Sequence, residues 1–353
     1  MTWRRGALGA AGIAIAATLL VLALRGVSLR AVGAEIARAD LSWFLVSCLL
    51  ATAAIPIRAV RWRVILAAGR PDVPWLGVWR ATAIGYMSNN LLPARGGEVA
   101  RGFLARSLVG IPVTTALASI VLERAFDGVV VAALLLAALA LPGRSAVVPA
   151  GVSDAAGMAA LAFVVVLGLI WVSTLAGRDP QRRLAALGRS LLPARLASRL
   201  EEVAAHVGGG TAVLRKPATA LAVAAWTIVL WLDNAASLYM GFQAFHLGPL
   251  PPASALLVQG VVALGLVAPS APGFFGSYEA FTRLALSTYG VPAAQALSFA
   301  VGTHVGWFVP VTVLGFWELG RAKLTWSDLR SGAAPAQDAQ VRASPSSNVT
   351  TGT

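Results

Sequence analysis

The chain has 353 residues, of which 58% are hydrophobic and only 12% are charged, and its formal net charge is +13. Soluble domains carry about 25% charged residues, so this composition excludes a soluble globular protein and predicts a polytopic membrane protein. The basic residues lie between apolar segments and not in one patch with interleaved aromatics, which argues against nucleic-acid binding, and the single cysteine, Cys48, excludes an intrachain disulfide and a thiolate metal cluster.

The first predicted membrane span is the uncharged segment 7–24, whose length fits a helix of about 20 residues. A removed signal peptide is the alternative, because residues 31–33 weakly resemble a cleavage site. A second span is predicted from Leu41 to about Ile57. The arginines that follow mark a cytoplasmic end by the positive-inside rule, with contacts to lipid phosphates as the alternative. These arginines are Arg58, Arg61, Arg63 and Arg70.

The next apolar segment, 80–92, is too short to cross a bilayer and runs into Asn89–Arg106, which contains a proline and a glycine pair. Basic residues on both sides predict a re-entrant hairpin that enters and leaves from the cytoplasm. Broken backbone at membrane depth is tolerated only where it is buried in protein or lines a wet cavity. We therefore expect a functional site here.

The predicted span 114–141 carries three ionisable residues, Glu123, Arg124 and Asp127. Spacings of three and four place them on one broad helical face. Ionisable groups at membrane depth are costly and usually functional. A structural ion pair that locks two helices together is the alternative.

The second part of the chain is predicted to contain further spans at 155–176, 218–242 and 293–319, with Asp233 and His304 at membrane depth. Residues 178–216 predict a cytoplasmic amphipathic linker. The tail 331–353 lacks periodicity and predicts disorder. The membrane-embedded domain is accordingly expected at 1–322, with its halves at about 41–142 and 218–320.

A second broken segment, 266–284, repeats the features of the first: prolines and glycines, then a glutamate on a new helix. Glu98 and Glu123 are 25 residues apart (123 − 98), and Glu279 and His304 are also 25 apart (304 − 279). Paired broken segments in two halves are typical of transporters built from inverted-topology repeats around a site at the bilayer midplane. We therefore predict such a repeat.

The glycines of both breaks leave free backbone N–H groups at a helix start, where anions bind. A lipid phosphate is the expected anion, and arginines supply charge-assisted hydrogen bonds to it. The alternative is that Glu98 and Glu279 only cap their own helices. The expected substrate-binding residues are Asn90, Arg95, Gly96, Gly97, Arg101, Arg124, Gly273 and Gly276. The expected charge-network or proton-coupling residues are Glu98, Glu123, Asp127, Asp233, Glu279 and His304.

An enzymatic function receives little support. The chain contains no HExxH motif and no Walker loop, and its three histidines lack the spacing of metal ligands. We predict no catalytic residues, no metal and no cofactor.

Three motifs resemble the flippase-like transmembrane region of lysylphosphatidylglycerol synthases: N-x-L-P-x-R-G-G-E-x-x-R at 90–101, E-R-x-x-D at 123–127 and P-x-x-P-G-x-x-G-x-x-E at 269–279. The resemblance covers about residues 7–322. It implies an integral plasma-membrane protein that moves a lipid or a lipid-linked precursor between leaflets. Family members that make aminoacylated lipids carry a large soluble domain after the membrane part. Here only a short tail follows, so we do not expect synthase activity.

Together these features predict an all-α polytopic membrane protein with about six transmembrane helices and two re-entrant helical hairpins in an inverted repeat, and with both termini in the cytoplasm. The predicted function is transbilayer movement of an anionic phospholipid or a polyprenyl-phosphate-linked lipid. The expected partners are membrane lipids, with a second copy of the chain or a lipid-modifying enzyme as further partners. Two alternatives are a non-transporting partner subunit of a lipid- or glycan-modifying enzyme, and a transferase with its site inside the membrane.

Overall fold

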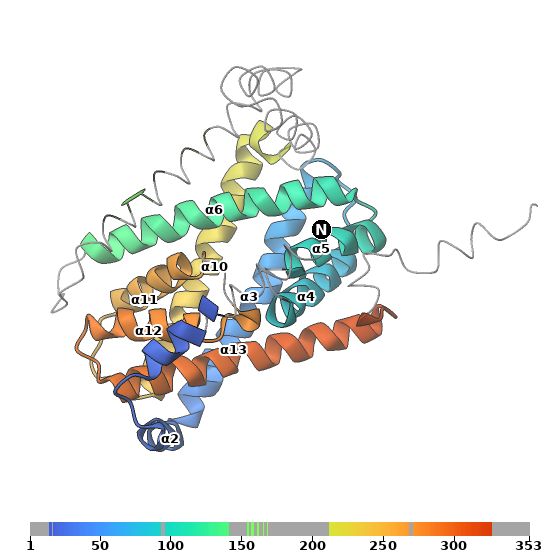
Figure 1. Cartoon of the computed structure of the whole chain (residues 1–353). Helices are drawn as coiled ribbons and strands as arrows, with labels where there is room; N and C mark the ends of the chain where they lie inside the picture. Colours follow the sequence, from blue (N-terminus) through green and yellow to red (C-terminus); the bar gives the residue numbers. More distant parts are fainter. Residues whose placement is uncertain are drawn as a thin grey trace, which may run out of the picture.

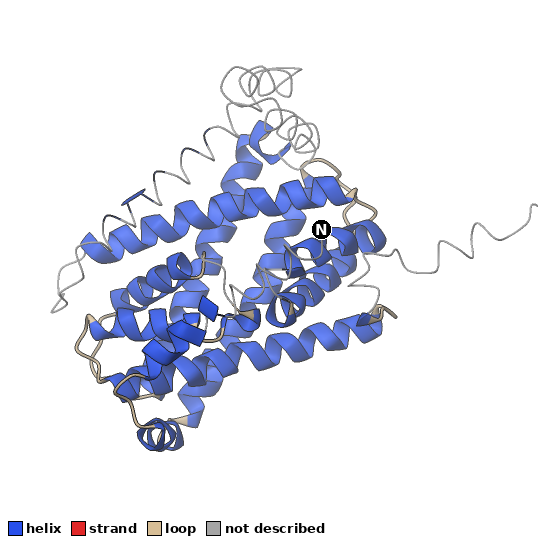
Figure 2. Ribbon diagram, in the orientation of Figure 1, coloured by secondary structure: helices blue, strands red, loops and turns tan. Residues whose placement is uncertain are grey.

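The computed structural model describes residues 14–15, 17–92, 96–140, 212–267 and 271–326, and single positions between 154 and 168. All regular structure among these residues is helical (Figure 2), which confirms the all-α class. The labelled elements in chain order are α2 (Leu29–Ala37), α3 (Leu41–Ala67), α4 (Trp75–Leu91), α5 (Gly96–Val109), α6 (Val113–Ala140), η2 (Ala212–Arg215), α10 (Pro217–Ala244), α11 (Pro252–Gly265), η3 (Pro272–Phe274), α12 (Ser277–Ser287) and α13 (Ala293–Arg321).

Three of these helices, α3, α10 and α13, are long and apolar enough to cross a membrane. A fourth span is available if the bent pair Ala17–Leu24 and Leu29–Ala37, which meet at 80°, counts as one. Helix α6 is as long, with 28 residues, but carries Glu123, Arg124 and Asp127 in its middle. The chain is therefore a membrane protein, while the total of six spans stays a prediction. Most of the predicted span 155–176, most of the linker and the tail lie outside the described residues.

The order of long and short helices repeats along the chain. Helices α3, α4, α5 and α6 have 27, 17, 14 and 28 residues. Helices α10, α11, α12 and α13 have 28, 14, 11 and 29 residues. At 1.5 Å per residue the short helices extend about 17 to 26 Å, less than the roughly 30 Å hydrocarbon core of a bilayer. Each half thus holds a pair of helices too short to span, between two that are long enough.

Helices α3 and α10 pack side by side and run antiparallel. At one end the Asp40 N–H donates to the Ala244 carbonyl oxygen at 2.8 Å, and at the other end Lys216 Nζ donates to the Ala68 carbonyl oxygen at 3.2 Å. The short helices also pack across the two halves. Helix α4 of the first half packs on α13 of the second, and α11 of the second half packs on α6 of the first (Figure 1). Each short helix pair therefore lies against the last long helix of the other half.

The two short pairs begin and end at opposite ends of the bundle. The α5 end lies beside Arg70, which donates to the Gly110 carbonyl oxygen at 2.8 Å, while the loop before α11 lies beside Gln295, which donates to the His246 carbonyl oxygen at 3.1 Å. Buried residues flank each break: Asn90 and Gly97 beside the first, and Gly273 and Glu279 beside the second. Element η3, within the second break, packs against α4.

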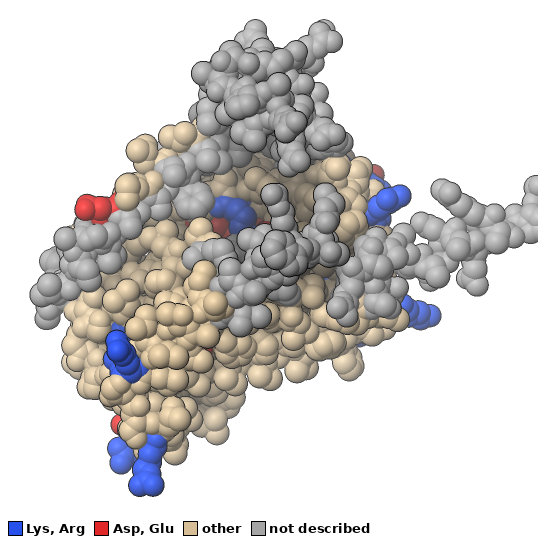
Figure 3. Space-filling model, in the orientation of Figure 1, with Lys and Arg blue, Asp and Glu red and all other residues tan. Residues whose placement is uncertain are grey.

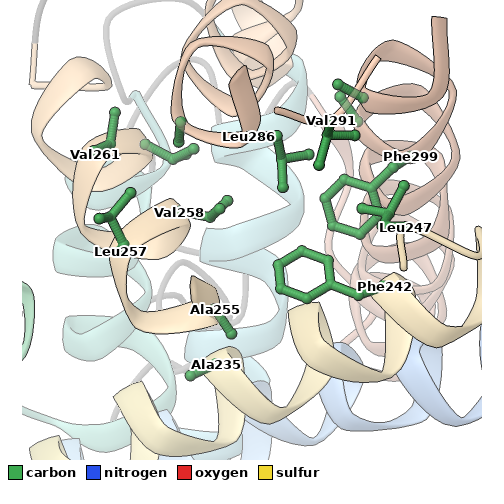
Figure 4. Packing of buried hydrophobic residues seen from close by; sticks show 14 of the residues in the cluster. Ala235, Phe242, Leu247, Ala255, Leu257, Val258, Val261, Leu286, Val291 and Phe299 are labelled. Atoms are coloured by element: carbon green, nitrogen blue, oxygen red, sulfur yellow. The ribbon is translucent and has the colours of Figure 1, made fainter. Parts of the chain in front are cut away.

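Each short pair packs in its own apolar core. Figure 4 shows the core of the second half, where Phe242 of α10 and Phe299 of α13 pack near Leu257 of α11 and Leu286 of α12. The core of the first half surrounds Trp62 of α3, with Ile84 of α4 and Leu104 of α5. In a bilayer, van der Waals packing of such side chains holds helices together, and the site described next lies among helices held in this way.

Candidate functional site

The main cluster of ionisable side chains lies among α3, α4, α5 and α6. It contains four arginines and three carboxylates, which we call the charged cluster: Arg58, Arg61, Arg101, Arg124, Glu98, Glu123 and Asp127. Figure 3 shows basic and acidic side chains recessed beneath α6 near the middle of that face, within a largely uncharged surface. The charged cluster therefore lies inside the bundle.

The buried part of the charged cluster is a network of ion pairs. The Arg61 side chain is fully buried and donates to Asp127 at 2.5 and 3.3 Å. Its guanidinium lies 3.5 Å from Glu123, which also pairs with Arg101. The Arg101 guanidinium stacks over the Trp62 ring, 4.3 Å from its centroid. Buried charges of this kind are tolerated only when they are paired and hydrogen-bonded.

The other part of the cluster is open. Arg124 and Glu98 pair at 3.0 Å with side chains that are 30% and 24% exposed. Arg124 also donates to Asp127 at 3.2 Å, as the three-residue spacing predicted. Arg124 and Arg58 both donate to the Tyr86 hydroxyl oxygen, at 3.2 and 2.9 Å. These half-buried groups form the mouth of the cluster.

The charges of the cluster do not cancel, since four arginines face three carboxylates. Arg58 is the unbalanced member, because no carboxylate among the described residues lies within ion-pair distance of it. Asp233 of α10 interacts electrostatically with Arg58 without forming an ion pair. With Asp233 counted, four arginines face four carboxylates, so the cluster offers an anion the hydrogen-bond donors of Arg58 rather than an excess of charge.

The sequence interpretation of Arg58 and Arg61 as markers of a cytoplasmic end is corrected by this geometry. Helix α3 does not stop at Ile57 but continues to Ala67, because both arginines find partners inside the protein. Arg61 contacts Asp127 and the Thr227 hydroxyl. In the sequence, the three-residue spacing of Arg58 and Arg61, about one helical turn, indicated that they share a face. Nothing in the sequence pointed to Tyr86 or Trp231, whose indole N–H donates to Asp127 at 3.0 Å.

The glycines of the first break bring two helices together. A Cβ on Gly97 would overlap the Gly85 carbonyl oxygen of α4 and lie 2.5 Å from the Asn89 nitrogen. Gly97 is thus required for the close crossing of α4 and α5, whereas a Cβ on Gly96 would lie 3.0 Å from the Leu92 side chain. Asn90 donates to the Thr312 hydroxyl at 2.9 Å and so links α4 to α13. The predicted binding residue Arg95 lies outside the described residues.

The second break is held by its own glutamate. Gly273 and Gly276 adopt left-handed backbone conformations, with φ of 68° and 82°, which glycine adopts at no steric cost. The Gly276 N–H donates to Glu279 at 2.6 Å. This N–H, predicted to bind a substrate anion, is here bound by the carboxylate of the same helix, which is the capping alternative.

Glu279 is also joined to His304, and both are buried. The Glu279 carboxylate lies 2.6 Å from His304 Nδ1, and the Gly273 carbonyl oxygen lies 2.8 Å from Nε2. The imidazole ring stacks between Phe275 and Trp307, with centroids 4.5 and 5.0 Å away. A histidine of the last long helix therefore ties the second break in place.

The two halves pair equivalent residues in a similar way. Glu98 and Glu279 both occupy the third position of the second short helix. Glu279 contacts the residue 25 positions later, His304, whereas Glu98 contacts the residue 26 positions later, Arg124. The Glu279–His304 pair is buried among aromatic rings, whereas the Glu98–Arg124 pair is partly exposed. Among the described residues no group of three His, Cys, Asp or Glu side chains is arranged to hold a metal ion.

Comparison with known proteins identifies the family of the chain. A search of curated proteins finds no match to the chain. The family model described as "Lysylphosphatidylglycerol synthase TM region" matches residues 9–315, a range that includes every described member of the charged cluster and the Glu279–His304 pair. The chain therefore belongs to the lysylphosphatidylglycerol synthase transmembrane-region family.

Proposed function

We propose that the protein moves a lipid with an anionic head group, an anionic phospholipid or a polyprenyl-phosphate-linked lipid, between the two leaflets of the plasma membrane. The observation that carries the proposal is the partly open charged cluster inside a membrane-embedded bundle, in which Arg58 has no carboxylate within ion-pair distance among the described residues. An ionisable site at this depth is costly and is expected to be functional. Membership of the family supports a lipid as the cargo.

The proposed architecture is an inverted repeat in which α4–α5 and α11–α12 are re-entrant hairpins entering from opposite faces. The antiparallel pairing of α3 with α10 and the opposite ends of the two short pairs support it. Broken helices around a central site are the usual arrangement of such transporters. In the proposed architecture, one half of the protein moves relative to the other around a bound lipid head group.

Both termini are proposed to lie in the cytoplasm. One end of the bundle carries more basic residues than the other, in keeping with the positive-inside rule. That end has Arg70, Arg106, Arg215, Lys216, Arg321 and Lys323, and the opposite end has Arg25, Arg30, Arg38 and Arg283.

Proton coupling at Glu279 and His304 forms the second part of the proposal. The Gly273 carbonyl oxygen only accepts, so His304 Nε2 donates to it. In a neutral ring His304 Nδ1 is then an acceptor, as is the Glu279 carboxylate. Their 2.6 Å contact therefore requires one proton between them. Loss of that proton weakens the bond that ties the second break to α13. The partly buried Asp233 is a second proposed proton carrier.

The test is a dithionite-quench assay on proteoliposomes that contain fluorescent phosphatidylglycerol, a polyprenyl-phosphate lipid or a cationic lipid. We expect the wild-type protein to expose inner-leaflet phosphate lipids to dithionite and Arg124→Ala to abolish this exposure. Arg63→Ala is the matched control, since Arg63 of α3 is exposed and donates to the Val73 carbonyl oxygen outside the cluster.

No movement of any lipid by folded wild-type protein would refute the proposal and favour a partner subunit of a lipid-modifying enzyme. Turnover of an added donor substrate would instead indicate a transferase, whereas the proposal treats the protein as a transporter without catalytic residues or cofactor.

A further inference from the structure

Two arginines of different helices converge on a single neutral oxygen at the mouth of the charged cluster. Arg58 Nη1 of α3 lies 2.9 Å, and Arg124 Nη2 of α6 lies 3.2 Å, from the hydroxyl oxygen of Tyr86 on α4. The Arg58 guanidinium also lies over the Tyr86 ring, 4.8 Å from its centroid. All three side chains are only partly buried.

The partners of these two arginines differ. Arg124 is neutralised by Glu98 at 3.0 Å and Asp127 at 3.2 Å, whereas the Tyr86 hydroxyl is the only hydrogen-bond acceptor of Arg58 among the described residues. A guanidinium pairs more strongly with an anionic oxygen than with a neutral phenol oxygen, because the attraction between two opposite charges adds to the hydrogen bond. The position of the Tyr86 oxygen is therefore one at which an anionic oxygen would bind more strongly.

We propose that Arg58 and Arg124 form the subsite for a monoanionic phosphodiester, in which a phosphate oxygen displaces the Tyr86 hydroxyl. Among the described residues no carboxylate lies within ion-pair distance of Arg58, so its guanidinium can pair with an anionic oxygen. A phosphodiester has two unesterified oxygens, one for each arginine, and its two ester arms lead to the apolar chains and to the head group. This inference rests on the proposed function and specifies the part of the lipid that the charged cluster recognises.

Binding is measured on purified protein in detergent, with a fluorescent short-chain phosphatidylglycerol as the probe. Competitors are unlabelled phosphatidylglycerol, glycerophosphoglycerol as the soluble phosphodiester, inorganic phosphate, and a trimethylammonium lipid that lacks phosphate. We expect competition from the phosphodiester lipid, weaker competition from its soluble counterpart and none from the cationic lipid. This order separates a lipid site from a site for free phosphate.

The variants separate recognition from a structural role. Arg58→Gln is expected to weaken phosphatidylglycerol binding about tenfold or more, the loss of one strong charge-assisted hydrogen bond, and Arg58→Lys to weaken it less. Tyr86→Phe removes only the displaced oxygen, so it should bind as tightly as the wild type or more tightly. If the three side chains only packed the helices together, Tyr86→Phe and Arg58→Gln would change phosphatidylglycerol binding to the same extent. Arg63→Gln on the same helix is the control and should leave binding unchanged.

Equal binding by Arg58→Gln and wild type would overturn the inference, as would a Tyr86→Phe variant that binds as poorly as Arg58→Gln. Equal competition by the cationic lipid would overturn it too, and lipid movement in the dithionite assay would then still uphold the proposed function. If no lipid is moved although phosphatidylglycerol binds as described, the phosphodiester subsite stands and the transport proposal fails.

Discussion

Asp127→Asn is expected to destabilise the protein more than any other single neutralisation in the charged cluster. Asp127 accepts hydrogen bonds from Arg61 at 2.5 and 3.3 Å, from Arg124 at 3.2 Å and from Trp231 at 3.0 Å. The substitution keeps the size of the side chain but raises the excess charge of the cluster from one to two. An uncompensated buried charge costs about 3 to 5 kcal/mol.

Arg61→Met provides the comparison, because it removes a fully buried arginine and lowers the excess charge from one to zero. Asp127 keeps Arg124 and Trp231 as partners, and Glu123 keeps Arg101. We therefore expect a smaller loss than for Asp127→Asn. The double variant restores an excess of one, so it should be more stable than Asp127→Asn alone, with a coupling energy of about 0.5 to 3 kcal/mol.

The assay is thermal unfolding in detergent followed by size-exclusion chromatography of the folded fraction. A loss of about 3 to 5 kcal/mol corresponds to a decrease in Tm on the order of 10 °C. Asp72→Asn, at an exposed position between α3 and α4, is the control and should change stability by less than about 0.5 kcal/mol. Wild-type stability of Asp127→Asn, or strictly additive losses in the double variant, would refute the charge-balance argument.

Two further predictions concern the two breaks. Gly97→Ala should lower the stability by about 3 kcal/mol or more, because the added Cβ overlaps the α4 backbone, whereas Gly320→Ala, with no atom within 4 Å of its Cβ, should be neutral or slightly stabilising in the same thermal assay. A stable Gly97→Ala protein would show that α4 and α5 need no close crossing. Glu279→Gln should fold normally, since an amide satisfies both His304 Nδ1 and the Gly276 N–H without an extra proton. Its lipid movement should no longer respond to a pH gradient, and an unchanged response would exclude Glu279 as the coupling group.

The sequence alone determined the class of the protein and the approximate positions of its helices. Composition excluded a soluble fold, and hydrophobic runs interrupted by proline and glycine predicted that helices end and begin again at two places. The structure has these boundaries between the end of α4 at Leu91 and the start of α5 at Gly96, and between the end of α11 at Gly265 and the start of α12 at Ser277. The predicted span 114–141 matches α6 within one residue at each end. These features depend on local composition and helical periodicity, which are readable without knowledge of the neighbours of a residue.

Only the tertiary structure decided which charges meet. Arg58 and Arg61 follow an apolar run. In a sequence, an arginine that marks the cytoplasmic end of a span looks the same as an arginine that forms a buried ion pair. Their role follows from Asp127, which is 66 positions away from Arg61 in sequence, and from Tyr86, which carries no local pattern. The glycine pair likewise predicted an anion site. In the structure, Gly97 is needed because α4 approaches α5 closely at this position. Partner identity depends on the packing of distant helices, and for that physical reason local sequence patterns do not contain it.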